Sequence, residues 1–447
     1  MASPPLSKVR HALPDSYWPS TYRLPLQATI TWLRSAKVAG FSLAVLLFLG
    51  LAFWKSPEIF AHPRFWAEEG YVYAYCRLHG FWSCMGHVHA GSYQLLMNIF
   101  VYLTNAVSVA QAPTVTTYLS LLVHVAVVAQ IVVFCEAYKL PRHIMLLLVT
   151  AWALLPQTYE VWATALNIQW VLGVSVLFIF VMPAGWLQRH IKGAAVWCFV
   201  CGVSGVPAVL MSPAFLLRAL IDRSRAPLVV SGVLGLCAGL QLAVLVLFGT
   251  VSNRAYPSDP AILALPLLLQ TVLPPISSVD TIVLLGQALA QHLYEPPLLF
   301  GTIVLGLGIM GTVLAIAASG LRGSRVYPTL FAWVFVTLVQ TFGAAASDPK
   351  SLLIPPNGGR YYLFGSVCLC IMLAWGSVAN VKTFRVIALG LLLSIGLNGA
   401  IQAEFSSWIT PFIQGPSWTD QIKDCQHGAT PCHILIWPVG WAIDILA

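Results

Sequence analysis

The chain has 447 residues, of which 58% are hydrophobic and only 9% are charged, whereas about a quarter of the residues of soluble domains are charged. Apolar runs of about 17 to 25 residues recur along its length, each enough for a helix to cross a hydrocarbon core of about 30 Å, so a soluble protein is excluded and an all-α polytopic membrane protein is predicted. The formal net charge of +8 predicts no nucleic-acid partner, because basic residues in short loops serve membrane orientation.

The first 35 residues are polar, basic and rich in proline. No small-residue cleavage site follows the first apolar run, so we expect that run to stay as an anchor rather than to be removed as a signal peptide. About eleven spans are predicted, two of them as half-length helices around SGVP at 204–207, since broken helices are tolerated where protein surrounds them. The expected positions are 36–54, 114–138, 143–157, 167–187, the pair within 194–220, 227–250, 297–320, 326–345, 361–380 and 386–402.

The apolar segment 93–111 is long enough to span as well. Counting it as a span would place the basic stretch KLPRH at 139–143 on the same side as Glu68 and Glu69, and would invert the basic loops that follow. We therefore interpret 93–111 as a helix lying at the outer membrane interface.

With this topology most basic residues fall on one side, which the positive-inside rule makes cytoplasmic, and most acidic residues fall on the other. The basic side receives the N-terminal segment and the loops near 139–142, 189–192, 218–225, 322–325 and 382–385. The chain is thus divided into a cytoplasmic segment 1–35, a transmembrane bundle 36–402 with a first outer loop at 55–113, and an outer-face tail 403–447.

The first outer loop contains an adjacent pair of acids, Glu68 and Glu69, flanked by Trp66 and Gly70. Desolvation at such a boundary can raise a carboxyl pKa toward general-base use. In a helix, consecutive residues diverge by about 100°, so one acid can act on a substrate while a basic group, a hydroxyl or a metal holds the other. The alternative is a pair of solvated charges in an aromatic belt formed by Trp66, Tyr71, Tyr73, Tyr75, Phe81 and Trp82.

Three histidines, His79, His87 and His89, follow the acids closely in sequence. Histidine and carboxylate together can ligate a divalent metal ion, but the spacing matches no zinc signature. We favour polar residues that hydrate an interfacial loop and assign no metal ligand or certain cofactor, with a divalent metal ion as the alternative.

Four cysteines lie outside the spans, and all four fall on the predicted outer face, where a disulfide can persist. Their close spacing predicts the pairs Cys76 with Cys84 and Cys425 with Cys432, and four unpaired thiols is the alternative. The remaining six are expected to be small packing residues within spans. The tail also carries Trp408, Trp418, Trp437 and Trp441, which we expect at the membrane interface, with a cap over the site as the alternative.

A family resemblance rests on FWAEEGYVYAY at 65–75 followed by HAGSYQLLMNIFVYL at 89–103. This pair of motifs resembles a group of bacterial membrane proteins with Phe-Trp-Ala-Glu-Asp-Gly followed by Pro-Tyr-Ala-Gly-Tyr, from which the chain departs at Glu69 and in HAGSY. The segment LLPQTYEVWATALNIQWVLG at 154–173 resembles their second outer motif. More broadly, a span, an outer acidic loop, an interfacial helix and a bundle with basic loops resemble the GT-C glycosyltransferases, which use lipid-phosphate-linked sugars.

The resemblance implies a GT-C-like bundle in which an acid of the first outer loop is the catalytic base or orients the acceptor, Glu69 first and Glu68 second. Arg360 in IPPNGGRYY, assisted by Lys350, is assigned to the departing lipid phosphate, because a guanidinium can hold two phosphate oxygens. An interfacial anchor is the alternative for Arg360. The other residues expected to bind the substrates are Glu160, Asn167, Gln169, His89 and Tyr93.

The predicted function is transfer of a sugar from a polyprenyl-phosphate donor to a cell-envelope glycan or lipid-linked acceptor, at the periplasmic face of the bacterial inner membrane. A transporter or flippase of a lipid-linked glycan is the alternative. Such proteins place ionisable residues near the bilayer midplane and often contain internal repeats, and neither is evident in this sequence. A non-catalytic scaffold for envelope assembly is a third interpretation.

Overall fold

The structure is a computed structural model. It describes residues 26–89, 91–248, 265–275, 277–291, 326–345, 350–354, 357–405, 415–425 and 432–445, with the single positions 306, 308 and 311. The chain divides into two units, Met1–Leu43 and Ala44–Ala447. The described part of the first unit is the beginning of helix α1 (Leu26–Lys55); the second unit contains the rest.

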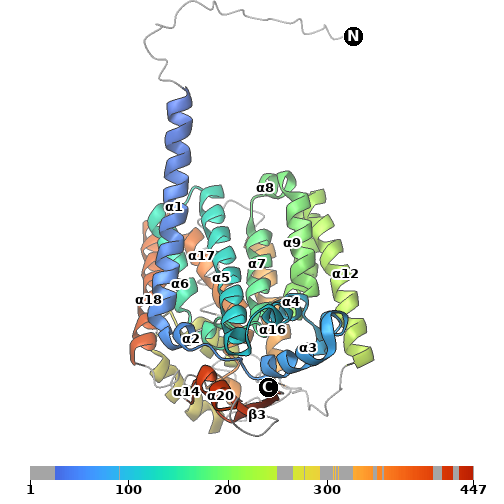
Figure 1. Ribbon diagram of the computed structural model, residues 1–447. Helices are drawn as coiled ribbons and strands as arrows, with labels where there is room; N and C mark the ends of the chain where they lie inside the picture. Colours follow the sequence, from blue (N-terminus) through green and yellow to red (C-terminus); the bar gives the residue numbers. More distant parts are fainter. Residues whose placement is uncertain are drawn as a thin grey trace, which may run out of the picture. The chain divides into compact units, whose positions relative to one another are not determined.

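The second unit is built mainly of α-helices whose long members run side by side (Figure 1). Proline stands at one of the first two positions of four of the described α-helices, where its missing N–H would have no partner in any case. The helices of the bundle and its short connections are α5 (Ala112–Ala137), α6 (Arg142–Leu154), α7 (Ile168–Val181), α8 (Ala184–Arg189), α9 (Ile191–Val203), α10 (Val206–Val209), α11 (Ser212–Asp222), α12 (Arg225–Phe248), α14 (Val279–Gln291), α16 (Val326–Ala345), α17 (Leu363–Gly376) and α18 (Lys382–Phe405).

The described residues contain six helical stretches long and apolar enough to cross a membrane. Two further expected spans, 143–157 and 167–187, are the shorter helices α6 and α7, with 13 and 14 residues, which reach only about 20 Å each. The expected span 297–320 lies outside the described residues apart from three positions. The six stretches are Val38–Lys55, Val109–Ala137, Arg225–Phe248, Val326–Ala344, Gly359–Gly376 and Lys382–Glu404.

The predicted pair of half-length helices within 194–220 is confirmed as α9 and α11, which are joined through the short α10. The chain breaks at Gly205, whose φ of 156° lies in a region that L side chains rarely adopt. A Cβ at this position would also collide with the side chain of Gln169. Glycine is therefore required where the two half-helices meet α7.

The segment 93–111, expected as a single helix at the outer interface, is not a continuous helix. It consists of the nine-residue helix α4 (Leu95–Leu103) followed by the 3₁₀ turns η2 (Thr104–Ala106) and η3 (Val109–Gln111). Before it stand α2 (Pro57–Ala61), α3 (Glu68–Met85) and the two-residue strands β1 (Val88–His89) and β2 (Ser92–Tyr93). These short elements gather at one end of the bundle, here called the loop end (Figure 1).

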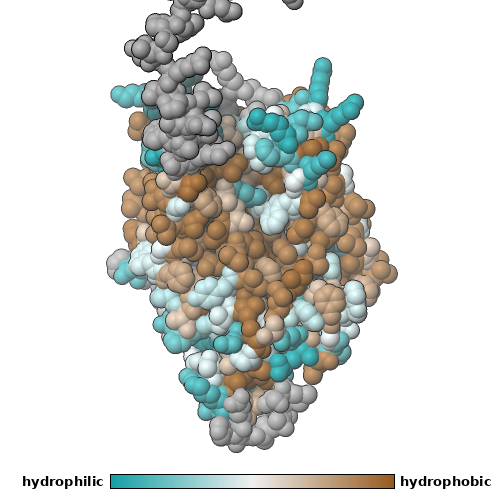
Figure 2. Space-filling model, turned by 45° about the horizontal axis from the view of Figure 1, so that its top comes forward, coloured by the Kyte–Doolittle hydropathy of each residue, from teal (hydrophilic) through white to brown (hydrophobic). Residues whose placement is uncertain are grey.

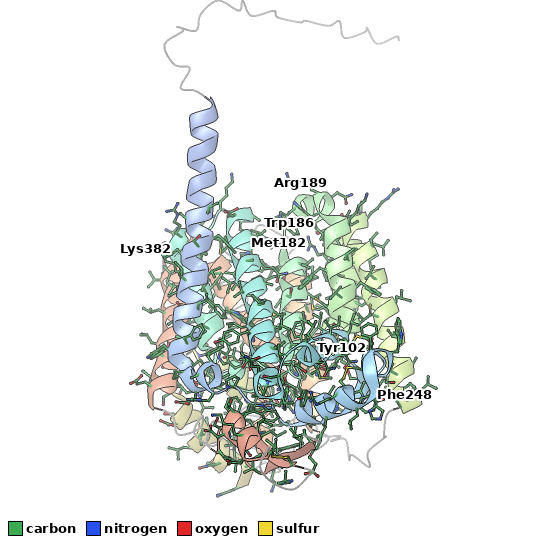
Figure 3. The ribbon with its side chains drawn as sticks, viewed as in Figure 1. Tyr102, Met182, Trp186, Arg189, Phe248 and Lys382 are labelled. Atoms are coloured by element: carbon green, nitrogen blue, oxygen red, sulfur yellow. A yellow bond between two sulfur atoms is a disulfide. The ribbon has the colours of Figure 1, made fainter. Side chains whose placement is uncertain are left out.

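The two ends of the second unit are polar, and the region between them is apolar. Hydrophilic residues cover both ends of the visible face, and a hydrophobic band separates them (Figure 2). Arg189 and Lys382 lie toward the end opposite to α3, while Phe248 lies toward the loop end (Figure 3). A belt of this kind between polar ends fits a bundle embedded in a membrane, with the predicted basic loops at the end away from the acidic pair.

The C-terminal tail folds onto the loop end as helix α20 (Trp418–Cys425) and the antiparallel hairpin of β3 (Cys432–Ile436) and β4 (Trp441–Ile445), with Cys432 opposite Ile445. Strand β3 alternates buried and exposed residues, so one face of the hairpin is apolar. Both predicted cysteine pairs lie at disulfide distance: the Cα atoms are 4.7 Å apart for Cys76 and Cys84, and 5.6 Å apart for Cys425 and Cys432.

The expectation that the tail tryptophans lie at the membrane interface is wrong for Trp418 and Trp437, which are buried within the protein. The Trp418 ring packs edge-on against Phe65, and its N–H donates to the Val109 carbonyl at 2.9 Å. The backbone N–H of Trp437 donates to the Phe65 carbonyl at 3.0 Å, and Trp437 forms an isolated parallel bridge with Trp66. The tail is therefore a cap on the segment that precedes the acidic pair.

Candidate functional site

The acidic pair forms the first turn of α3. Glu69 is only 2% exposed. Burial raises the pKa of Glu69 to about 7, against the opposing effect of its hydrogen bonds. These bonds come from the Thr116 hydroxyl and from the backbone N–H groups of Trp66, Ala165 and Leu166. Glu69 is thus held by a hydroxyl and by backbone donors, and it changes protonation near neutral pH.

Gly70, the next residue, lets α3 approach the C-terminal hairpin closely. A Cβ at this position would lie 2.7 Å from Ile436 Cδ1 and 3.0 Å from Ile443 Cγ2. The hairpin therefore sets the position of the helix turn that carries both glutamates.

Glu68 points to a different set of partners. It is half-buried, and it lies close enough to Arg360 and His89 to interact electrostatically with both. The two acids therefore have different surroundings, as consecutive helical residues should: Glu69 is enclosed by protein, and Glu68 is half-buried within electrostatic range of Arg360 and His89.

Arg360 also meets Glu160, which comes from a distant part of the chain. Glu160 lies on η4 (Pro156–Val161), and Arg360 lies on η7 (Gly359–Tyr362). The Glu160 carboxylate accepts hydrogen bonds from the backbone N–H groups of Gly358 at 3.2 Å and Arg360 at 3.3 Å. Its Oε2 also lies 3.7 Å from Arg360 Nη1, and the guanidinium carbon lies 5.1 Å from the centre of the Tyr361 ring. One carboxylate thus orients both the backbone and the side chain of the arginine.

Glu68, Glu69, Glu160 and Arg360 together are here called the carboxylate–arginine cluster. Its two glutamates on α3 and its arginine on η7 are almost 300 residues apart in sequence, but Glu68 lies within electrostatic range of Arg360. The cluster combines a carboxyl group that titrates near neutrality with a guanidinium able to hold a phosphate.

Asn167 and Gln169 have structural partners in this arrangement. The Asn167 side-chain amide is buried and donates to the backbone carbonyl of Glu160 at 2.6 Å, so it supports η4 from the start of α7. Gln169, the second residue of the same helix, places its Cβ in the space left by the missing side chain of Gly205. The structure brings Asn167 into the surroundings of the cluster and places Gln169 against the broken hairpin.

His89 and Tyr93 lie on the small β1–β2 hairpin. Burial lowers the pKa of His89, and the charge of Glu68 opposes that effect. The Tyr93 hydroxyl donates to the Met85 carbonyl at 2.9 Å, and the backbone N–H and carbonyl of Tyr93 both bond to the Gln241 side chain. His89 is therefore beside the cluster, whereas Tyr93 ties the hairpin to α12.

Lys350 is exposed and stands directly before η6 (Ser351–Leu353), ten residues before Arg360. The loop between them is held by Gln270, which sequence reasoning missed. The Gln270 side-chain amide donates to the carbonyls of Leu352 at 2.7 Å and Asn357 at 2.9 Å. The sequence could have indicated this role, because Gln270 is a lone glutamine in the apolar run LALPLLLQTV and a buried amide needs hydrogen-bond partners.

Lys55 is a second residue whose role the sequence did not reveal. It is buried, and its Nζ donates to the Ala153 carbonyl at 3.1 Å and to Thr158 Oγ1 at 2.5 Å. The ammonium also lies 4.1 Å and 4.7 Å from the ring centres of Tyr159 and Trp162. The end of α1 is thereby fixed to η4, which carries one glutamate of the cluster.

The three histidines that suggested a possible metal site do not share one set of neighbours. His79 and His87 both stack against Tyr75, with ring centres 4.2 Å and 4.5 Å from it, while His89 faces Glu68. In the part of the chain that the structure describes, no group of three or more His, Cys, Asp or Glu side chains is close enough to hold a metal ion.

Comparison with known proteins adds no relative: no protein-family model matches the chain, and no curated protein sequence does. The chemistry of the cluster is therefore read from its own residues. They comprise a buried carboxyl group with a raised pKa and an arginine paired with a second glutamate, in a protein whose visible face carries an apolar band.

Proposed function

We propose that the protein is a membrane-embedded glycosyltransferase with a GT-C-like bundle, which transfers a sugar from a polyprenyl-phosphate donor to a cell-envelope glycan or lipid-linked acceptor. The observation that supports it most directly is the cluster itself. Arg360 is paired with Glu160 from a distant segment and lies within electrostatic range of Glu68, which is next in sequence to the buried Glu69.

The proposed reaction uses the cluster in two ways. The acceptor hydroxyl oxygen forms a bond to the anomeric carbon of the sugar while the bond from that carbon to the lipid phosphate oxygen breaks. The hydroxyl proton passes to a carboxylate, and the lipid phosphate leaves as an anion that a guanidinium can hold through two oxygens. Arg360, already oriented by Glu160, is assigned to the phosphate.

The two acids receive different roles. A general base must reach the proton that it removes, and this geometric condition comes before the condition on its pKa. Glu68 is half-buried beside Arg360, whereas Glu69 is enclosed by protein. We therefore reverse the order suggested by the resemblance: Glu68 contacts the acceptor, and Glu69 positions the first turn of α3.

The proposed location is the periplasmic face of the bacterial inner membrane. The hydrophobic band between the polar ends offers the polyprenyl chain a place in the bilayer while its phosphate reaches the loop end (Figure 2). The basic residues at the opposite end support a cytoplasmic assignment of that end. The two cysteine pairs at the loop end support an oxidising compartment there.

The test is an assay of the purified protein in lipid nanodiscs with a panel of polyprenyl-phosphate-linked sugars. The readout is the release of free polyprenyl phosphate, which reports sugar transfer whatever the acceptor. Glu68→Gln and Arg360→Gln should both abolish the release. The matched control is Glu58→Gln, because Glu58 is an exposed acid on the same loop and lies 3.9 Å from His62.

Each variant is first checked for normal membrane insertion, so that lost activity is not lost protein. If the wild type releases lipid phosphate and both cluster variants release it at the same rate, the assigned site is wrong. If the wild type instead moves a labelled lipid-linked glycan across the bilayer without releasing lipid phosphate, the protein is a flippase and the glycosyltransferase proposal fails.

A further inference from the structure

The second half of α3 ends in a loop that the chemistry of the cluster does not use. Cys76 and Cys84 are both buried and paired, while every residue between them, RLHGFWS at 77–83, is exposed. The helix is interrupted at Gly80, whose φ of 75° favours glycine. These seven residues, here called the disulfide-closed tip, project from the protein as a small closed loop.

The disulfide-closed tip exposes large apolar side chains. Leu78 is 62% exposed, Phe81 is 42% exposed and Trp82 is 84% exposed. Water is an unfavourable environment for three such side chains on adjacent turns of one loop. Because the disulfide keeps these side chains on the outside of the protein, we expect them to contact an apolar environment rather than water.

The position of the tip points to lipid as that cover. The neighbouring Tyr93 is bonded through its backbone to Gln241 of α12, at 3.0 Å and 2.9 Å. Beyond Gln241, α12 exposes Leu242 and the apolar residues 245–248, and α12 is one of the helices able to cross a membrane. Phe81 also packs edge-on against Tyr102 of α4, and both Tyr102 and Phe248 lie on the α3 side of the bundle (Figure 3).

The composition of the tip fits a bilayer surface better than a protein partner. Its charged and titratable residues are Arg77 and His79, without a carboxylate, which suits anionic head groups. Tryptophan is enriched at the head-group level because its ring is amphipathic. A second copy of the chain would need a patch of about 800 Å² on each partner, far more than three side chains of one loop provide.

We propose that the disulfide-closed tip inserts Leu78, Phe81 and Trp82 into the lipid interface beside the end of α12. The tip and the acidic pair belong to the same 18-residue element. Insertion of the tip therefore holds α3 along the membrane surface and keeps Glu68 at the level of the lipid head groups. This anchoring is independent of the proposed sugar transfer, although it would bring the acid close to a lipid-borne substrate.

The experiment measures where the Trp82 indole lies. The full chain is placed in nanodiscs of phosphatidylethanolamine and phosphatidylglycerol, and the emission of Trp82→Phe is subtracted from that of the wild type. The difference signal is then exposed to lipids brominated near the head group and, separately, to aqueous iodide. Trp54 of α1, which is exposed within a candidate span, is the matched control through Trp54→Phe.

The expected result is a blue-shifted Trp82 signal that loses most of its intensity to the brominated lipid and little to iodide, as the Trp54 signal does. Quenching by iodide alone would place the indole in water and overturn the proposal. Quenching by neither reagent would place it against protein, such as a second copy, and would overturn it equally. If Trp82→Phe does not insert, Leu78→Trp supplies a second indole in the same tip for the same comparison.

Discussion

The buried acid Glu69 should make the stability of the protein depend on pH in a way that Glu69→Gln removes. In the folded protein the pKa of Glu69 is raised by burial from the ordinary value of 4.5 to about 7. Between these two values the folded chain keeps a proton that the unfolded chain releases, so this group makes folding less favourable as the pH rises. The loss is complete above pH 7 and amounts to about 3.5 kcal/mol, at roughly 1.4 kcal/mol per pH unit.

Glutamine does not titrate, so the variant should gain stability relative to the wild type as the pH rises from about 4.5 to about 7. The assay is thermal unfolding in nanodiscs, followed by tryptophan fluorescence at a series of pH values. The hydrogen bonds lost in the variant, including that from Thr116, change the stability difference between variant and wild type by the same amount at every pH. The titration of Glu69 instead makes this difference depend on pH. Glu58→Gln, which removes an exposed acid, should show no such slope.

A difference in melting temperature between Glu69→Gln and wild type that stays flat across this range would refute the reasoning. It would mean that hydrogen bonding to the carboxylate outweighs its burial and that Glu69 ionises at an ordinary pKa. If the variant became less stable relative to wild type as the pH rises, the reasoning would be refuted more strongly, because the folded state would then favour the charged form of Glu69.

Three further predictions concern packing and the cysteines. Lys55→Met should lower the melting temperature, at a cost of about 3 kcal/mol for the lost hydrogen bonds and cation–π contacts. The control Lys192→Met, at an exposed site, should leave the melting temperature unchanged. If both variants had the same melting temperature, the contacts of Lys55 would not stabilise the protein. Gly399→Ala should destabilise the protein by about 1–3 kcal/mol, because its Cβ would collide with the Leu154 carbonyl on α6. The control is Gly390→Ala on the same helix α18, whose Cβ would meet open space among the described residues. If Gly399→Ala did not change the stability, α18 and α6 would not be in close contact. Alkylation of the denatured protein should modify six cysteines without reductant and all ten after reduction, and ten without reductant would show that both pairs are open.

Some features of the site followed from sequence because they depend on local spacing. The divergence of Glu68 and Glu69 is a property of consecutive residues on any helix, and their partners in the structure do differ. The pairing of Cys76 with Cys84 was predictable because the two cysteines are only eight residues apart and were both expected on the same side of the membrane. The half-length helices depended on a short apolar run interrupted near Gly205.

Other features were beyond sequence reasoning because they join distant segments. The length of the run at 167–187 indicated a complete span, but the helix α7 ends at Val181, and every residue from Val171 to Val181 is buried by other segments of the protein. Trp418 looked like an interfacial tryptophan by composition, yet it packs against Phe65, more than 350 residues earlier. Composition alone cannot distinguish an indole covered by lipid from one covered by protein.

What the sequence determined by itself is the helical class and the local elements: a chain this apolar forms helices able to cross a membrane, and adjacent acids on a helix must point apart. What only the tertiary structure decided is which charges meet. Arg360 finds Glu160 across 200 residues and lies near Glu68 across almost 300, and Lys55 is enclosed by η4. Helical periodicity acts over a few residues, whereas the burial and pairing of a charge depend on every segment that packs around it.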